Sequence, residues 1–140
     1  MDDLESIYTD IIMEQSVSNH NKRELENLDK KEHGHNPSCG DDITLQVKFD
    51  GEIISKISYI GHGCAISQAS TNIMIDLLKG KTKKEANILI DIFIKMVNGD
   101  KIEGVELEKI GDAIAFKNIS KIPARVKCAT LAWETMKRVV

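Results

Sequence analysis

Three cysteines stand at positions where a thiol can become reactive. Cys39 lies in a stretch with proline and glycine that reads as a loop. Cys64 follows a Gly-His-Gly turn at the start of a predicted helix, and Cys128 falls in the second turn of the last predicted helix. Backbone N–H groups and the helix dipole at such positions favour the thiolate, which is both the nucleophile and the metal-binding form of cysteine. The sequence therefore offers sulfur chemistry at each of these positions.

The spacing of the cysteines leaves their arrangement in space open. No Cys-x-x-Cys pair occurs, so the spacing rules of zinc fingers do not apply. Cys39-Gly40-Asp41 places a thiolate and a carboxylate around a glycine, and a tight turn there would let both reach one ion. Together with Cys64 and Cys128 they would complete a tetrahedral zinc site. The alternative is that the cysteines are small core side chains, the commonest fate of free cysteine.

Other polar residues could support a site built on these thiols. Arg125 lies one turn before Cys128 and could stabilise an anion or a persulfide, or it could be an ordinary arginine on a helix surface. Among the histidines, His35 and His62 could lie beside the ligands and orient them. We expect His20 and His33 to be solvated surface residues.

The pattern around these residues predicts a β-hairpin. Residues 42–49 alternate apolar and polar side chains, Asp50-Gly51 is the dipeptide that type I′ turns prefer, and residues 52–60 form the returning strand. We expect Gly61-His62-Gly63 to break this strand. Residues 18–32 are polar and charged, which indicates an excursion over the surface.

Helices account for most of the remaining chain. Apolar residues recur at helical spacing over residues 3–17, 64–79, 82–97 and 123–140, and Thr82 to Glu85 has the sequence of a capping box. Residues 101–118 give a weak pattern, with a short helical turn around 105–110. Trp133 and Met136 are predicted to pack in the core. Together these elements predict an α+β fold, a small antiparallel sheet with helices packed on one face.

Composition narrows the class of protein. A chain of 140 residues with 41% hydrophobic residues is expected to form a single domain over residues 1–140. Its net charge of −3 provides no basic excess for nucleic acid or anionic lipid. The sequence contains neither an apolar stretch that would span a membrane nor a phosphate-binding glycine loop. With an acidic start and an odd number of cysteines, we expect a cytoplasmic protein with free thiols.

Three blocks of the sequence resemble the SufU-type proteins of iron–sulfur cluster assembly, which are relatives of the IscU and NifU scaffolds. They are Asn-Pro-Ser-Cys-Gly-Asp at 36–41, Gly-His-Gly-Cys-Ala-Ile-Ser-Gln-Ala-Ser at 61–70, and Pro-Ala-Arg-Val-Lys-Cys-Ala-Thr-Leu-Ala-Trp at 123–133. Each block carries one cysteine, and the resemblance runs from about Leu4 to the C-terminus.

Two features favour the SufU branch of this group. IscU scaffolds typically have a histidine directly before the third cysteine, where this chain has Lys127. The segment between the Cys64 helix and Cys128 is also long, as in SufU-type proteins. One segment departs from the group: residues 15–23 lack the His-Tyr-x-x-Pro-Arg-Asn type motif of the relatives, so the order of this loop and its part in partner docking stay open.

The resemblance implies a SufE/NifU-like fold and a zinc site formed by Cys39, Asp41, Cys64 and Cys128. It also implies a SufS-type, pyridoxal-phosphate-dependent cysteine desulfurase as partner, with downstream Suf assembly proteins as recipients. The leading hypothesis is a zinc-dependent sulfurtransferase in which Cys39, on a glycine loop, accepts persulfide sulfur beside Arg125. One alternative is a scaffold that holds iron as a [2Fe–2S] cluster. Another is an adaptor in which zinc is purely structural.

Overall fold

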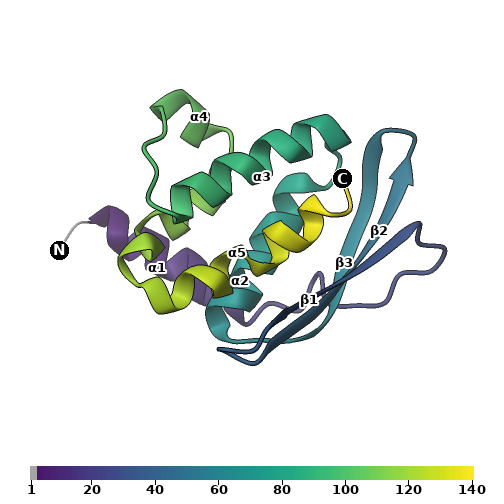
Figure 1. Cartoon of the computed structure of the whole chain (residues 1–140), viewed down its shortest axis with the longest axis horizontal. Coiled ribbons are helices and arrows are strands. Elements are labelled where there is room, and N and C mark those ends of the chain that lie inside the picture. The colour runs from purple at the N-terminus through teal and green to yellow at the C-terminus, as the bar shows by residue number, and fades with distance from the viewer. Residues whose placement is uncertain (1–2) are drawn as a thin grey trace.

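The computed structural model describes residues 3–140 as a three-stranded sheet and a group of helices that cover one of its faces (Figure 1). In chain order the elements are α1 (Asp3–Ser16), β1 (Lys30–Asn36), β2 (Asp41–Asp50), β3 (Ile53–His62), α2 (Ala65–Leu78), α3 (Lys83–Val97), α4 (Gly104–Glu108), the 3₁₀ helix η1 (Gly111–Lys121) and α5 (Pro123–Lys137). Helices α2 and α5 pack against the sheet, and α1, α3 and η1 pack against these two helices. The predicted α+β fold is confirmed.

The sheet is antiparallel with β2 in the centre, in the order β1-β2-β3. The predicted hairpin corresponds to β2 and β3. The prediction of a surface excursion up to residue 32 is wrong, because Lys30–Asn36 forms a third strand. This strand lacks an apolar alternation, since its buried positions are Gly34 and Asn36. A Cβ at Gly34 would lie 2.2 Å from Thr135 Oγ1, so the absence of a side chain lets β1 pack directly on α5.

The connection between β2 and β3 differs from the predicted type I′ turn. Asp50 pairs with Ile53, so Gly51 and Glu52 are the central residues. Of these two only Gly51 has a positive φ, 60°, whereas a type I′ turn needs positive φ at both. A glycine at the first central position fits a type II′ turn. Strand β3 also continues beyond the predicted break, because Gly61 still pairs with β2 at a φ of 118°.

The segment from residue 18 to residue 29 crosses the face of the sheet that points away from the helices, which we call the outer face. It first pairs with the free edge of β3, where the Arg23 N–H donates to the Tyr59 carbonyl at 3.1 Å. It then crosses β2, where the Leu25 N–H donates to Gln46 Oε1 at 2.8 Å. Since Leu45 and Val47 face the core, Gln46 faces outward, and this crossing accounts for its burial.

Hydrogen bonds to α2 order the atypical stretch at residues 15–23. The side chain of Asn72 donates to the carbonyls of Gln15 and Ser18, at 2.9 and 3.1 Å. Asn21 is buried and donates to Asp76 Oδ1 at 3.0 Å. The stretch is therefore fixed to α2 by polar contacts, although it lacks the proline-containing motif of the relatives.

The helical core lies between α2, α3, η1 and α5. The Trp133 ring stacks on Phe93 with 3.8 Å between centroids and 7° between planes, and its indole N–H donates to Ser70 Oγ at 2.8 Å. Trp133 and Met136 are buried, as predicted. The region that begins at residue 101, where the sequence pattern was weak, forms the short α4 and then η1, which was not predicted. Helix η1 adds Phe116 and Ile119 to the core. Within the described residues, no helix is long and apolar enough to cross a membrane.

The start of α3 provides a test of the local structure. The Thr82 hydroxyl accepts from the Glu85 N–H and the Glu85 carboxylate accepts from the Thr82 N–H, both at 3.1 Å, so the predicted capping box is present. We expect Thr82→Ala to lower the free energy of unfolding by about 1 kcal/mol, because the Glu85 N–H loses its acceptor. Urea denaturation measures this, with Thr82→Ser as the control that keeps the cap. Equal midpoints for the two variants would contradict the prediction.

Candidate metal centre

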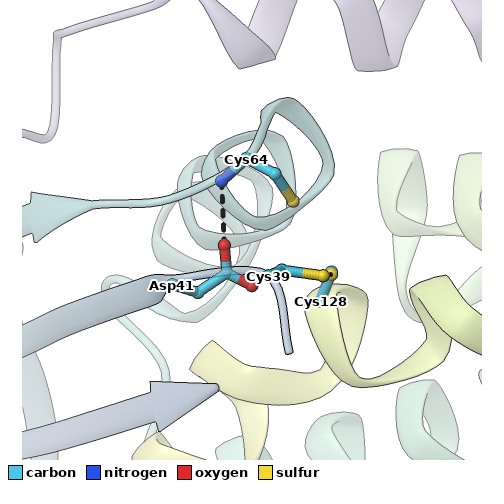
Figure 2. Close-up of side chains that lie close together, drawn as sticks. All are labelled: Cys39, Asp41, Cys64 and Cys128. Carbon is cyan, nitrogen blue, oxygen red and sulfur yellow. Dashed lines mark hydrogen bonds between the residues drawn. The ribbon is translucent and has the colours of Figure 1, made fainter. Parts of the chain in front are cut away.

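The three thiols and the Asp41 carboxylate meet where the sheet abuts α2 and α5 (Figure 2). Cys39 lies in the loop between β1 and β2, and Asp41 is the first residue of β2. Cys64 caps the N-terminus of α2, and Cys128 lies in the second turn of α5. One ligand atom from each residue lies within 4.8 Å of those of the others. Residues from distant parts of the sequence thus form one cluster of metal-binding atoms.

Asp41 is fully buried and accepts hydrogen bonds on both oxygens. The Cys64 backbone N–H donates to Oδ1 at 2.8 Å, and Asn36 Nδ2 donates to Oδ2 at 3.3 Å. Figure 2 shows the first of these bonds linking the start of β2 to the start of α2. Because a buried carboxylate without donors is costly, these bonds hold Asp41 with its free lone pairs turned toward the sulfurs.

The sulfurs differ in their surroundings. The Cys64 sulfur accepts from the Ser67 N–H at 3.5 Å, and the positive end of the α2 dipole favours negative charge there. Cys128 is buried, and its Sγ lies 2.7 Å from the sulfur of the half-buried Cys39. The cysteines are free thiols and form no disulfide with one another.

The pKa of the Cys128 thiol reflects its burial among the other ligands. Burial raises its pKa strongly, and hydrogen bonding with the thiols of Cys39 and Cys64 raises it further. The negative charges of Cys64 and Asp41 act in the same direction. A cation among the four groups would act against these effects and favour the Cys128 thiolate.

Arg125 lies on the solvent side of the cluster. It is exposed, and its Nη1 donates to Cys39 Sγ at 3.5 Å. The pKa of the guanidinium is raised chiefly by its hydrogen bond to Cys128, and next by the charge of Cys39. The arginine is thus placed to stabilise negative charge on Cys39, rather than lying free on the helix surface.

Two residues of the centre were not identified from the sequence. Asn36 donates to Asp41 and lies 3.7 Å from the Cys128 sulfur, and its role depends on the strand β1 that the pattern did not predict. Gly63 lets the chain pass close to the cluster, since a Cβ there would lie 2.9 Å from Asp41 Oδ1 and 3.0 Å from Ser67 Oγ. Gly63 could have been identified from the sequence, because it lies between the predicted strand and the cysteine at the start of the next helix.

The histidines lie away from the sulfurs. His35 and His62 pair with Asp42, whose side chain points to the outer face, so the possibility that they lie beside the ligands is not realised. The expectation of surface positions holds for His20 and His33, which are exposed. Each lies within hydrogen-bonding distance of a carboxylate, His20 of Asp76 at 3.0 Å and His33 of Asp42 at 2.8 Å.

The donor set fits a metal ion. Three sulfurs and one carboxylate oxygen match the ligand types and number of a tetrahedral zinc site, and thiolates also bind iron in clusters. Their negative charge in a partly buried space calls for a compensating cation. The close approach at Gly63 leaves the carboxylate free to face the sulfurs. Fold and site together define a small α+β protein with a candidate thiolate-rich metal centre.

The chain belongs to the family of NifU-like N-terminal domains, which matches residues 7–129. Over 98% of its length it is 38% identical to the iron–sulfur cluster assembly scaffold protein IscU of Streptococcus pyogenes, of which it covers 84%. Over the same share it is 36% identical to the zinc-dependent sulfurtransferase SufU of Bacillus subtilis, of which it covers 91%. The resemblance found in the sequence is therefore confirmed.

A solved structure agrees with this assignment. The fold matches the crystal structure of a protein described as an iron–sulfur cluster assembly scaffold for the SUF system, from Fervidobacterium islandicum. The TM-score is 0.87 at 41% identity, and the match covers 95% of this chain and 96% of the other. The described architecture is thus that of a SufU-type structure.

The close packing at Gly63 makes a prediction about metal affinity. We expect Gly63→Ala to weaken zinc binding by about tenfold or more, because the new methyl group displaces Asp41 or Ser67 from its position. Competition with a chromogenic chelator measures the affinity. Gly104→Ala is the matched control, since a Cβ there meets nothing within 4 Å. Equal zinc affinity in the two variants would show that the cluster does not depend on this approach.

Proposed function

We propose that this chain is a zinc-dependent sulfurtransferase of iron–sulfur cluster assembly, which accepts persulfide sulfur from a SufS-type cysteine desulfurase. The observation that carries the proposal is the cluster of three thiols and Asp41, in which the half-buried Cys39 lies beside an arginine. The named activity of the Bacillus subtilis relative supports it.

Cys39, Asp41, Cys64 and Cys128 are the residues that would hold zinc. Bound zinc would keep these sulfurs deprotonated at neutral pH. Asp41 would contribute a hard oxygen ligand, which binds zinc differently from sulfur. Asn36 and the Cys64 N–H hold this carboxylate in place by hydrogen bonds.

Cys39 is the proposed acceptor of sulfur. It lies in a loop next to Gly40, whose positive φ of 69° is a conformation that glycine adopts without strain. Its side chain is half-buried, whereas that of Cys128 is buried. Its thiolate attacks the outer sulfur of the desulfurase persulfide, and a new S–S bond forms on Cys39. The S–S bond in the partner breaks, and the electron pair leaves with the partner's cysteine thiolate. The step needs no external oxidant or reductant.

Arg125 is proposed to assist this transfer. Its guanidinium lies 3.5 Å from the Cys39 sulfur, so it can offset the charge of the attacking thiolate and of the persulfide that results. A downstream Suf assembly protein would then take the sulfur by the same exchange. Both partners are inferred from the chemistry of the site and from the resemblance.

The second candidate function is a scaffold that carries a [2Fe–2S] cluster as cargo. The same ligands could hold it, and relatives named as scaffold and as sulfurtransferase are 38% and 36% identical to this chain. Lys127, where IscU scaffolds typically have a histidine, favours sulfur transfer. Its side chain is exposed while that of the neighbouring Cys128 is buried, so it lies outside the cluster of ligands.

Replacing the proposed acceptor tests the transfer. We expect Cys39→Ala to abolish stimulation of a SufS-type desulfurase, because no thiolate remains to take the persulfide sulfur. Sulfide or alanine release by the desulfurase measures stimulation, and circular dichroism checks that the fold is kept. Arg125→Lys keeps the charge and should retain part of the stimulation. Full stimulation by the Cys39 variant would exclude Cys39 as acceptor.

Metal content separates the candidate functions. We expect about one zinc per chain and a colourless solution after purification without air, because three thiolates and a carboxylate suit tetrahedral zinc. Elemental analysis and the visible spectrum measure this. Iron with a brown sulfide-to-iron absorption would favour the scaffold. Zinc with no persulfide detected on any cysteine after mixing with a desulfurase would favour a structural role, and neither metal would favour core packing.

A further inference from the structure

A second group of metal-binding side chains lies on the outer face of the sheet. It lies at the Asp42 end of β2, whereas the segment 18–29 crosses β2 at Gln46. It consists of His33, His35, Asp42 and His62, which we call the outer-face cluster. His33 and His35 are exposed on β1, while Gly34 and Asn36 between and after them are buried. The register places His35 opposite Asp42, and Asp42 opposite His62, so one row across all three strands carries three of the four.

The members of the outer-face cluster already interact. His33 Nε2 lies 2.8 Å from Asp42 Oδ1, and the rings of His33 and His35 stack with centroids 6.3 Å apart and planes 19° apart. One imidazole thus already contacts the carboxylate, and a second lies beside the first.

The chemistry of these groups is that of a transition-metal site. Imidazole nitrogen with carboxylate oxygen is a donor set that binds Zn²⁺, Co²⁺ and Ni²⁺. Histidines separated by one residue on a strand project from the same face, so both can reach one ion. Side chains of His33 and Asp42 are 56% and 45% exposed, which leaves them free to rotate from their mutual hydrogen bond toward an ion.

We propose that the outer-face cluster is a second metal site, specific for divalent transition-metal ions, with His33, His35 and Asp42 as ligands and His62 as a fourth from β3. An ion there replaces the hydrogen bond between His33 and Asp42. The imidazoles must turn toward one another to share an ion, and the exposure of His33 and Asp42 leaves room for that rotation.

This site shares no ligand with the thiolate centre. Asp41 and Asp42 are consecutive on β2, so their side chains point to opposite faces of the sheet. Sulfur ligands hold zinc more tightly than half-exposed imidazoles do, and an ion at the outer-face cluster can therefore exchange while the centre stays loaded. The proposal does not depend on sulfur transfer.

Cobalt binding to the zinc-loaded chain tests this site. Co²⁺ is titrated into wild type, His33→Gln/His35→Gln and Asp42→Asn, and binding is followed by calorimetry and by absorption. Wild type is expected to bind one further ion without the sulfur-to-cobalt charge-transfer band that a thiolate site produces. Both variants should lose about tenfold or more of this affinity, while zinc in the thiolate centre is unchanged.

His20→Gln is the matched control, because His20 forms a similar half-exposed hydrogen bond with Asp76 on another part of the surface. It is expected to bind the second ion as wild type does. No second ion in wild type, unchanged binding in His33→Gln/His35→Gln, or an equal loss in His20→Gln would each overturn the proposal. Failure of the thiolate centre gives a different result, since the chain then holds no zinc before the titration but keeps the histidine-dependent binding of cobalt.

Discussion

The buried carboxylate of Asp41 is the constraint on which the arrangement of the site depends. A charge with no solvent contact needs donors, and it receives them from Asn36 at the end of β1 and from the Cys64 N–H at the start of α2. To deliver that second donor, the chain leaving β3 must turn closely over β2. Gly61, which pairs with β2 at a φ of 118°, and Gly63, which has no Cβ to strike the carboxylate, make this path possible.

Much of the fold follows from local patterns in the sequence. The alternation in β2 and the helical spacing of α2, α3 and α5 were sufficient to place these elements. The capping box at the start of α3 is formed by the predicted residues. Strand β1 could not be predicted this way, because its inward side chains are a glycine and an asparagine and its stability comes from β2 and α5. The turn at Gly51 depended on a pairing register that composition does not specify.

The candidate site was predictable in its residue types but not in its geometry. Cysteines beside glycines at element boundaries indicated ligands, whereas their approach to within 4.8 Å depends on the packing of α2 and α5 against the sheet. The histidines were misplaced for a related reason. Nearness in sequence to Cys39 and Cys64 suggested nearness in space, but a strand sends alternate side chains to opposite faces. Asp41 and Asp42 follow the same rule.

The contact between Trp133 and Ser70 joins the two helices that carry Cys64 and Cys128. Trp133 is the single tryptophan of the chain, is fully buried, and stacks on Phe93. Its fluorescence therefore originates from one site, in a dry interior, at the joint between α2 and α5. A change in that emission would report the separation of these helices. Movement of the Cys39 loop alone would leave the tryptophan emission unchanged.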